Sequence, residues 1–218
     1  MDELCPLYLI TPPQIEADRF AADVDAALRA GEAAGVPIAC LQLRLKEVPD
    51  DKVLAAAEAL LLVLNTHSVP LIMNDRADLA KAAGAKGVHL GQTDGSVREA
   101  RALLGEEADI GVTCHDSRHL AMVAAEQGAD YVAFGAFFPT STKETVHRPD
   151  PEILTAWSQM TVVPCVAIGG ITSENAGSLV AAGADYLAVS SAVWGHPDGP
   201  GAGVEAFLPT LRETVPQL

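Results

Sequence analysis

Polar side chains that suit phosphate groups and a metal ion recur at the ends of short apolar segments in this chain. Gln42, Arg44 and Lys46 stand at every second position, so an extended chain would present all three on one face. Two cations and an amide on one face can hold a polyanion. A solvated strand edge is the alternative explanation, because the sequence shows no partner for these side chains.

Two carboxylates follow the next two apolar segments. Asn74 and Asp75 close the first of these segments, and Asp94 follows the segment that contains His89. Carboxylates from neighbouring strand ends can share Mg²⁺, which takes oxygen ligands and keeps waters or substrate phosphates. A magnesium site at Asp75 and Asp94 is one interpretation of these residues, and ordinary aspartates in turns and caps, where this residue is common, are the alternative. His89 lies within an apolar run, which favours a hydrogen-bonded core histidine over a ligand.

Hydroxyl groups and a further cation follow the later segments. His115 closes one segment, where it could act as an acid–base group or hydrogen-bond a loop. The next segment is followed by Thr140, Thr142 and Lys143, a set that suits phosphate contact. A plain polar loop is the alternative for these three residues.

The elements that must position these residues form a repeating pattern of short apolar strands and alanine-rich helices. Strands are predicted over 7–11, 38–44, 70–74, 87–90, 110–114, 131–135, 163–168 and 186–190. Helices are predicted over 16–34, 51–66, 76–83, 96–104, 117–127, 151–159, 173–182 and 204–214. Continuous apolar runs are typical of parallel strands that are buried on both faces. Eight strand–helix units in 218 residues predict an α/β fold, a single (β/α)₈ barrel spanning residues 1–218.

The predicted barrel fold indicates where a phosphate group would bind. The loops that follow strands seven and eight commonly hold a phosphate, and here they contain Gly170, Ser190 and Ser191. Glycine lets a ligand approach bare backbone N–H groups. The first strand ends without the glycine-rich turn of a dinucleotide-binding fold, so that class is not favoured.

Composition excludes several other classes. With 14 basic and 29 acidic residues the net charge is −15, which argues against binding to nucleic acid or an anionic membrane. No apolar run approaches the ~20 residues that span a membrane, and the acidic start MDELCPLYLI does not resemble a secretory signal. The four cysteines are far apart and form no Cys-x-x-Cys motif, and the three that lie inside apolar runs are expected to be small buried hydrophobes. A reduced, cytoplasmic compartment is the simplest fit to this pattern. The sequence does not determine the oligomeric state.

Six motifs resemble those of the thiamine-phosphate synthase family, in order and along nearly the whole chain from Tyr8 to Val193. They are QLRLK at 42–46, NDRADLA at 74–80, GVHLGQTD at 87–94, GADYVAFGAFFPTSTK at 128–143, VAIGGIT at 166–172 and VSSA at 189–192. The resemblance implies a (β/α)₈ barrel that joins hydroxymethylpyrimidine diphosphate to hydroxyethylthiazole phosphate. The implied products are thiamine phosphate and pyrophosphate.

The resemblance also implies a role for each matching residue. The pyrimidine diphosphate would contact Gln42, Arg44, Lys46, Asn74 and Thr113, the last standing where the family commonly has serine. Mg²⁺ would be held by Asp75 and Asp94, and the thiazole phosphate by Thr140, Thr142, Gly170, Ser190 and Ser191. Lys143 would contact the pyrophosphate, and with Arg44 and Lys46 would be one of the catalytic cations.

Some positions depart from the family pattern. Pro12 follows Thr11 where aspartate is usual, Leu45 replaces a frequent glutamate, Ser190 replaces valine or isoleucine, and residues 144–151 lack an expected glycine. Two other functions would use part of the same residue set. A thiazole tautomerase of the same superfamily would use His115 to move protons, but it would not need the paired aspartates and the basic set. A non-catalytic phosphate-binding barrel would keep Gly170 and Ser191 but would need no metal pair.

Overall fold

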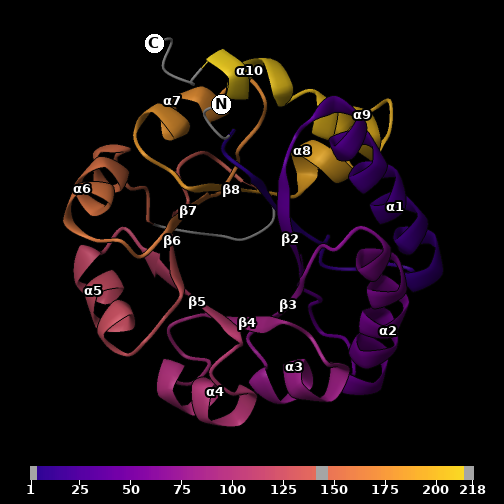
Figure 1. Cartoon of the computed structure of the whole chain (residues 1–218), viewed down its shortest axis with the longest axis horizontal. Coiled ribbons are helices and arrows are strands. Elements are labelled where there is room, and N and C mark those ends of the chain that lie inside the picture. The colour runs from indigo at the N-terminus through magenta and orange to yellow at the C-terminus, as the bar shows by residue number, and fades with distance from the viewer. Residues whose placement is uncertain (1–3, 141–146, 214–218) are drawn as a thin grey trace.

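Eight parallel strands close into a barrel in the order of the chain, as the computed structural model shows for residues 4–140 and 147–213 (Figure 1). The strands are β1 (Leu7–Ile10), β2 (Ile38–Leu43), β3 (Leu71–Asn74), β4 (Gly87–Leu90), β5 (Asp109–His115), β6 (Tyr131–Gly135), β7 (Cys165–Ile168) and β8 (Tyr186–Val189). Each strand pairs with its neighbour in sequence, and β1 pairs with β8 to close the ring. The predicted barrel is therefore confirmed, with strand bounds within two residues of those expected.

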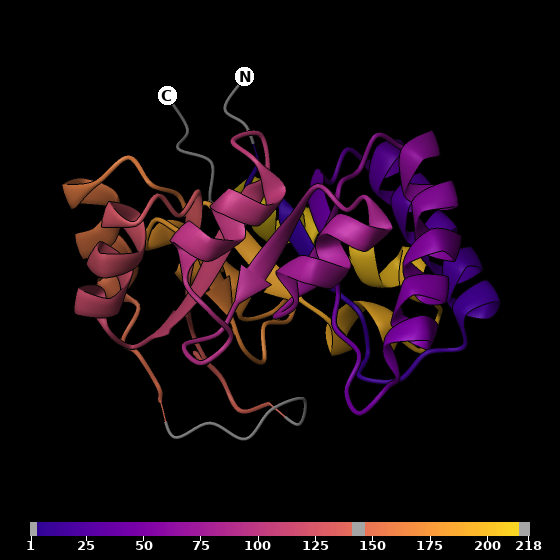
Figure 2. The same cartoon turned by 90° about the horizontal axis from the view of Figure 1, so that it is seen from below.

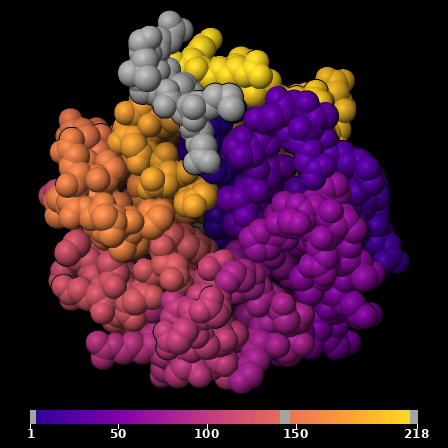
Figure 3. Space-filling model, in the orientation of Figure 1, coloured from indigo at the N-terminus to yellow at the C-terminus, as the bar shows by residue number. Residues whose placement is uncertain are grey.

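Helices cover the outside of this ring (Figures 1 and 2). They are α1 (Ala17–Ala34), α2 (Asp50–Thr66), α3 (Ala77–Ala83), α4 (Val97–Leu104), α5 (Arg118–Glu126), α6 (Glu152–Met160), α7 (Ala176–Ala181), α8 (Ser191–Trp194), α9 (Pro200–Glu205) and α10 (Leu208–Glu213). Successive parts of the chain occupy successive sectors around the molecule (Figure 3). The prediction of one final helix over 204–214 was wrong. The chain there forms α9 and α10, and Pro209 lies in the first turn of α10, where a missing N–H costs little.

Local signals explain where several helices begin and end. Gly35 and Gly84 follow α1 and α3 with φ of 77° and 69°, the left-handed conformation that favours glycine. Ser96 and Glu99 form the predicted capping box at the start of α4, because each side chain accepts a hydrogen bond from the other residue's backbone N–H.

The core has two shells. The outer shell packs the helices against the sheet and contains Trp157, Phe134 and Phe207, all fully buried. The inner shell fills the barrel interior and contains Tyr8, Ile10, Cys40, Ile72, Tyr131, Ala133, Val166 and Ala188. Because successive strand residues point to opposite faces, one strand supplies both shells, which is why the strands read as unbroken apolar runs.

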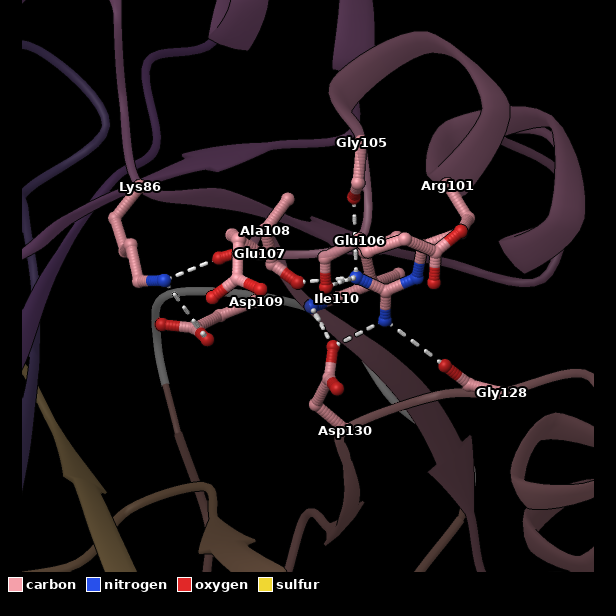
Figure 4. Close-up of polar contacts among 10 residues, drawn as sticks. All are labelled: Lys86, Arg101, Gly105, Glu106, Glu107, Ala108, Asp109, Ile110, Gly128 and Asp130. Carbon is pink, nitrogen blue, oxygen red and sulfur yellow. Dashed lines mark hydrogen bonds and ion pairs between the residues drawn. The ribbon is translucent and has the colours of Figure 1, made fainter.

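Residues 128–130 and 183–185 repeat the sequence Gly-Ala-Asp just before β6 and β8, where the aspartates have a structural role. The Asp130 carboxylate accepts a hydrogen bond from the Ile110 N–H at 2.7 Å, and Asp185 accepts one from the Cys165 N–H at 2.8 Å. Each aspartate therefore ties its own strand to the preceding one. Arg101 of α4 adds to the first tie with an ion pair to Asp130 and a hydrogen bond to the Gly128 carbonyl (Figure 4).

A partly buried ionic cluster of Asp25, Glu32 and His67 joins α1 to the end of α2. The two ring nitrogens of His67 lie 3.0 Å from Asp25 Oδ1 and 2.8 Å from Glu32 Oε1. Only 6% of the His67 side chain is exposed. Hydrogen bonds to Asp25 and Glu32 favour the protonated ring, so the pKa of His67 is raised above its ordinary value.

All four cysteines are buried free thiols, which confirms the burial predicted for the three in apolar runs and extends it to the fourth. Burial raises the pKa of Cys5, Cys114 and Cys165 to about 12 and that of Cys40 further, which keeps all four protonated near neutral pH. In the described part of the chain, no helix is both long and apolar enough to cross a membrane.

Candidate active site

A cavity of about 810 Å³ opens at the C-terminal ends of the strands. Its lining comes from the ends of every strand and from the segments that follow them. The predicted site residues among its lining are Gln42, Arg44, Asn74, Asp75, Asp94, Thr113, Thr140, Gly170, Ser190 and Ser191. Residues more than a hundred positions apart in sequence therefore meet at one barrel mouth, the place where barrels of this type carry their chemistry.

The polar end of the cavity is organised by β2 and β3. The buried Gln42 side chain donates from Nε2 to Asn74 Oδ1 at 2.9 Å, which fixes both amides. The Arg44 backbone N–H donates to the Thr11 hydroxyl at 2.9 Å, which holds the chain just past the end of β2. Arg44 Nη1 is buried and has no hydrogen-bond partner among the described residues. A buried guanidinium nitrogen without a partner is costly, and an anion in the cavity would relieve that cost.

Lys46 is placed differently from the prediction. The described lining of the cavity does not include it, and its side chain is exposed. β2 ends at Leu43, and the two-residue alternation reaches Arg44 but not Lys46, because the chain bends at Lys46 and Glu47, where Glu47 has a φ of 55°. The Lys46 backbone N–H instead donates to the Pro13 carbonyl at 3.0 Å. Its expected contact with the diphosphate stays a prediction.

Asp75 and Asp94 both line the cavity. Asp75 directly follows β3 with a φ of 63°, a left-handed conformation uncommon for residues other than glycine, and its N–H donates to the His89 carbonyl at 2.8 Å. Asp94 Oδ2 accepts from the Gly91 N–H at 3.0 Å, which fixes the orientation of that carboxylate. The described residues contain no group of three or more His, Cys, Asp or Glu side chains able to hold a metal.

His89 and Thr113 form the floor of the cavity between β4 and β5. His89 is 7% exposed, and its Nε2 lies 2.8 Å from Thr113 Oγ1. The Thr113 carbonyl accepts a hydrogen bond from Gln92 Nε2 at 2.6 Å. The prediction of His89 as a hydrogen-bonded core histidine is confirmed, and the side chain also borders the cavity.

The opposite end of the cavity is lined by the loops after β7 and β8. Gly169 and Gly170 have φ of 102° and 64°. Asn175 holds this turn, since its Oδ1 accepts from the Thr172 N–H at 2.9 Å and its Nδ2 donates to the Gly170 carbonyl at 3.0 Å. A Cβ on Gly170 would collide with the Pro139 carbonyl oxygen, so loop packing requires glycine there independently of any ligand.

The segment after β6 contributes residues that sequence reasoning missed. Thr140 lines the cavity, whereas Thr142 and Lys143 lie outside the described residues. His147 and Arg148 also line it. The His147 ring stacks on His115 with centroids 4.7 Å apart, and its Nδ1 lies 3.0 Å from Asp116 Oδ1. No periodicity or spacing marks His147 and Arg148, so only the fold identifies them.

Comparison with known proteins agrees with this geometry. A family model described as thiamine monophosphate synthase matches residues 7–193. The thiamine-phosphate synthase of Rhodospirillum centenum is 58% identical over 208 residues, which cover 95% of this chain and 98% of that relative. The thiamine-phosphate synthase of Hyphomonas neptunium is 50% identical over 206 residues, covering 92% and 91% of the two chains.

Solved structures give the same result. A thiamine phosphate pyrophosphorylase from Pyrococcus furiosus superposes with a TM-score of 0.82 at 28% identity, covering 97% of this chain and 98% of that one. Orotidine 5′-phosphate decarboxylase from Pyrococcus horikoshii, at 17% identity and a TM-score of 0.64, shares the fold alone. The family match over most of the sequence and the identity to the curated relatives lead to one conclusion: this chain belongs to the thiamine monophosphate synthase family.

Proposed function

We propose that this protein joins 4-amino-5-hydroxymethyl-2-methylpyrimidine diphosphate to hydroxyethylthiazole phosphate and releases pyrophosphate, forming thiamine phosphate with the help of Mg²⁺. The observation that carries the proposal is Arg44 Nη1, which is buried without a hydrogen-bond partner among the described residues, in a cavity that Asp75 and Asp94 also line. A cation and two carboxylates together suit a diphosphate that arrives with a divalent metal, because neither charge type alone would complement that ligand.

The two ends of the cavity would bind the two substrates. At the polar end, Arg44 would pair with diphosphate oxygens, and the fixed amides of Gln42 and Asn74 would contact the pyrimidine substrate. At the other end, the loops of Gly170, Ser190 and Ser191 would receive the thiazole phosphate through backbone N–H groups and hydroxyls, with Thr140 from the β6 side. Two phosphorylated substrates would thus share one barrel mouth.

Asp75 and Asp94 are the residues that would hold Mg²⁺. Two carboxylates fit this ion, which usually keeps several waters and takes its remaining ligands from substrate phosphates. The hydrogen bond from Gly91 orients the Asp94 carboxylate before the ion binds. When bound, the ion would neutralise negative charge that develops on the departing pyrophosphate.

The protein's part in the chemistry is positioning and electrostatics. The bond between the pyrimidine methylene and the diphosphate oxygen breaks, and its electron pair leaves with pyrophosphate. The electron-rich aminopyrimidine stabilises the methylene cation, and the thiazole nitrogen then donates its lone pair to form the new C–N bond. Arg44 would stabilise the leaving group, as would Lys46 and Lys143 in their proposed roles. The buried protonated cysteines are not needed as nucleophiles.

A direct assay tests the proposal. The purified protein is incubated with both substrates and Mg²⁺, and thiamine phosphate and pyrophosphate are measured separately. We expect both products in equal amounts, and neither product when one substrate is left out or the metal is chelated. Absence of thiamine phosphate under these conditions would overturn the proposal, and conversion of a thiazole phosphate carboxylate between its isomers would then identify a tautomerase.

A further inference from the structure

A chain of buried hydrogen bonds crosses the interior of the barrel beneath the cavity. Tyr8 Oη lies 2.8 Å from Tyr131 Oη, and Tyr131 Oη lies 3.1 Å from His89 Nδ1. His89 Nε2 lies 2.8 Å from Thr113 Oγ1, and both His89 and Thr113 line the cavity. Four side chains from β1, β6, β4 and β5 thus link the middle of the barrel to the floor of the site. The family resemblance implies a substrate contact for Thr113, and the other three have no assigned role.

Packing holds these four hydrogen-bonded side chains in one arrangement. The Tyr131 ring lies over Gly111, where an added Cβ would collide with the ring and its hydroxyl. The rings of His89 and Tyr131 stack with centroids 5.6 Å apart and an interplanar angle of 29°. Tyr8 and Tyr131 are 4% and 9% exposed. Burial raises the pKa of both phenols well above 10.0, so each hydroxyl keeps one proton to donate.

The direction of the hydrogen bonds decides what Thr113 offers to a ligand. A neutral imidazole carries one N–H and one acceptor nitrogen. If Nδ1 carries the proton, Thr113 must donate its hydroxyl proton to Nε2, and it faces the cavity as an acceptor. If Nε2 carries the proton, Tyr131 donates to Nδ1, Nε2 donates to Thr113, and the threonine proton is available to the cavity. A phenol is a stronger acid than an aliphatic alcohol and therefore the better donor to a basic nitrogen, which favours the second direction.

We propose that Tyr131 and His89 are positioning residues that fix the His89 Nε2–H tautomer and so make Thr113 a hydrogen-bond donor to the substrate. The proposal rests on the proposed function, since the acceptor is a ring nitrogen of the aminopyrimidine at the polar end of the cavity. Tyr8 completes the chain by donating to Tyr131. The tyrosines act through the threonine hydroxyl and touch no substrate themselves.

Nitrogen-15 NMR of histidine-labelled, ligand-free wild-type protein tests the direction without any substitution. Protonated and unprotonated ring nitrogens resonate in separate regions, and the signals of His89 among the six histidines are those that disappear in His89→Gln. We expect His89 to show a protonated Nε2 and an unprotonated Nδ1, and Tyr131→Phe to increase the Nδ1–H tautomer. A wild-type spectrum with the proton on Nδ1 would overturn the proposal.

Kinetics test whether this direction matters for the substrate. Losing one hydrogen bond should lower kcat/KM for the pyrimidine diphosphate by about tenfold in Thr113→Val and by a similar factor in Tyr131→Phe. KM for the thiazole phosphate should stay within about twofold, and Thr113→Ser, which keeps the hydroxyl, should restore activity. The double variant should be no worse than Thr113→Val alone. Additive losses would show that Tyr131 acts independently of Thr113 and would refute the coupling.

Tyr186→Phe is the matched control. Tyr186 is another tyrosine packed against the inner shell, but it takes no part in the hydrogen bonds from Tyr8 to Thr113 and is absent from the described cavity lining. The same substitution there should therefore leave the kinetics of both substrates unchanged. An equal loss in Tyr186→Phe would assign the effect to general packing and refute the proposal. A wild-type protein that forms no thiamine phosphate would refute the proposed function instead, and the histidine spectrum would still determine the direction of the chain.

Discussion

Compared with a methionine at the same position, Arg44 should lower the stability of the ligand-free protein and raise the stability of the protein with pyrimidine diphosphate bound. Its Nη1 is buried without a partner among the described residues, and leaving a buried donor unsatisfied costs about 1–3 kcal/mol. Arg44→Met removes that nitrogen and keeps an unbranched apolar stem in the same space. We expect the ligand-free variant to gain about 1 kcal/mol of stability, which raises Tm by about 2–4 °C in a domain of this size.

The same substitution should weaken binding of the pyrimidine diphosphate. A hydrogen bond to a charged group contributes about 1.5–3 kcal/mol, so affinity should fall by about 10- to 100-fold. Thermal unfolding with and without the substrate measures both effects, because the rise in Tm that the substrate causes should shrink while the ligand-free Tm increases. Calorimetry gives the affinity directly.

Arg29→Met provides the control. Arg29 is an exposed arginine on α1, and its solvent-screened ion pair with Asp25 at 2.7 Å should contribute little to stability. We expect this variant to bind both substrates normally. A lower ligand-free Tm in Arg44→Met, or unchanged affinity for the diphosphate, would refute the reasoning that Arg44 Nη1, which has no partner among the described residues, is placed to bind an anion.

Three further predictions concern the metal, pH and stability. Asp75→Asn and Asp94→Asn should each lower turnover by about 100-fold at limiting Mg²⁺, and near wild-type rates in both would remove them as metal ligands. His67→Asn should lower the free energy of unfolding most at pH values below about 6.5, because the pKa of His67 is raised in the folded state, which means that folding favours the protonated ring. This loss of stability should disappear as pH rises through the folded-state pKa of His67. Urea unfolding of the wild type and the variant at pH 6 and at pH 9 measures the loss at each pH. Arg101→Met should destabilise the protein by about 2–4 kcal/mol and leave kcat unchanged, since its partners lie at the barrel end opposite the cavity; a changed kcat at full folding would contradict this.

The barrel could be predicted from the sequence because its signals are local and repeated. Each strand is an apolar run, and Gly35 and Gly84 mark helix ends by a conformation that glycine adopts readily. The C-terminal end was predicted less well. Residues 191–194 and 200–205 form helices of four and six residues, too short for a periodic pattern to show.

The site was predictable where extended backbone continues and unpredictable where it stops. Alternation correctly places Gln42 and Arg44 on one face, but the bend at Lys46 is set by the contact with Pro13, which no local pattern reveals. The link between Tyr8 and Tyr131 spans 123 residues, so two tyrosines in apolar runs read as ordinary core. Gly170 was correctly placed in the cavity, yet loop packing also requires glycine there.

The closure of the ring between β1 and β8 has a consequence for how the protein is synthesised. Trp194 Nε1 donates to the Ile10 carbonyl at 2.7 Å, across 184 positions of sequence, and β1 pairs with β8 along Leu7–Leu9. While the chain is being translated, β1 has only β2 as a partner, and one edge of it stays open until β8 emerges. Such distant contacts slow folding, so the pairing of β1 with β8 is a late step and is also the one that hides the exposed edge. A chain that stops before β8 would retain two open strand edges and should aggregate rather than form a smaller barrel.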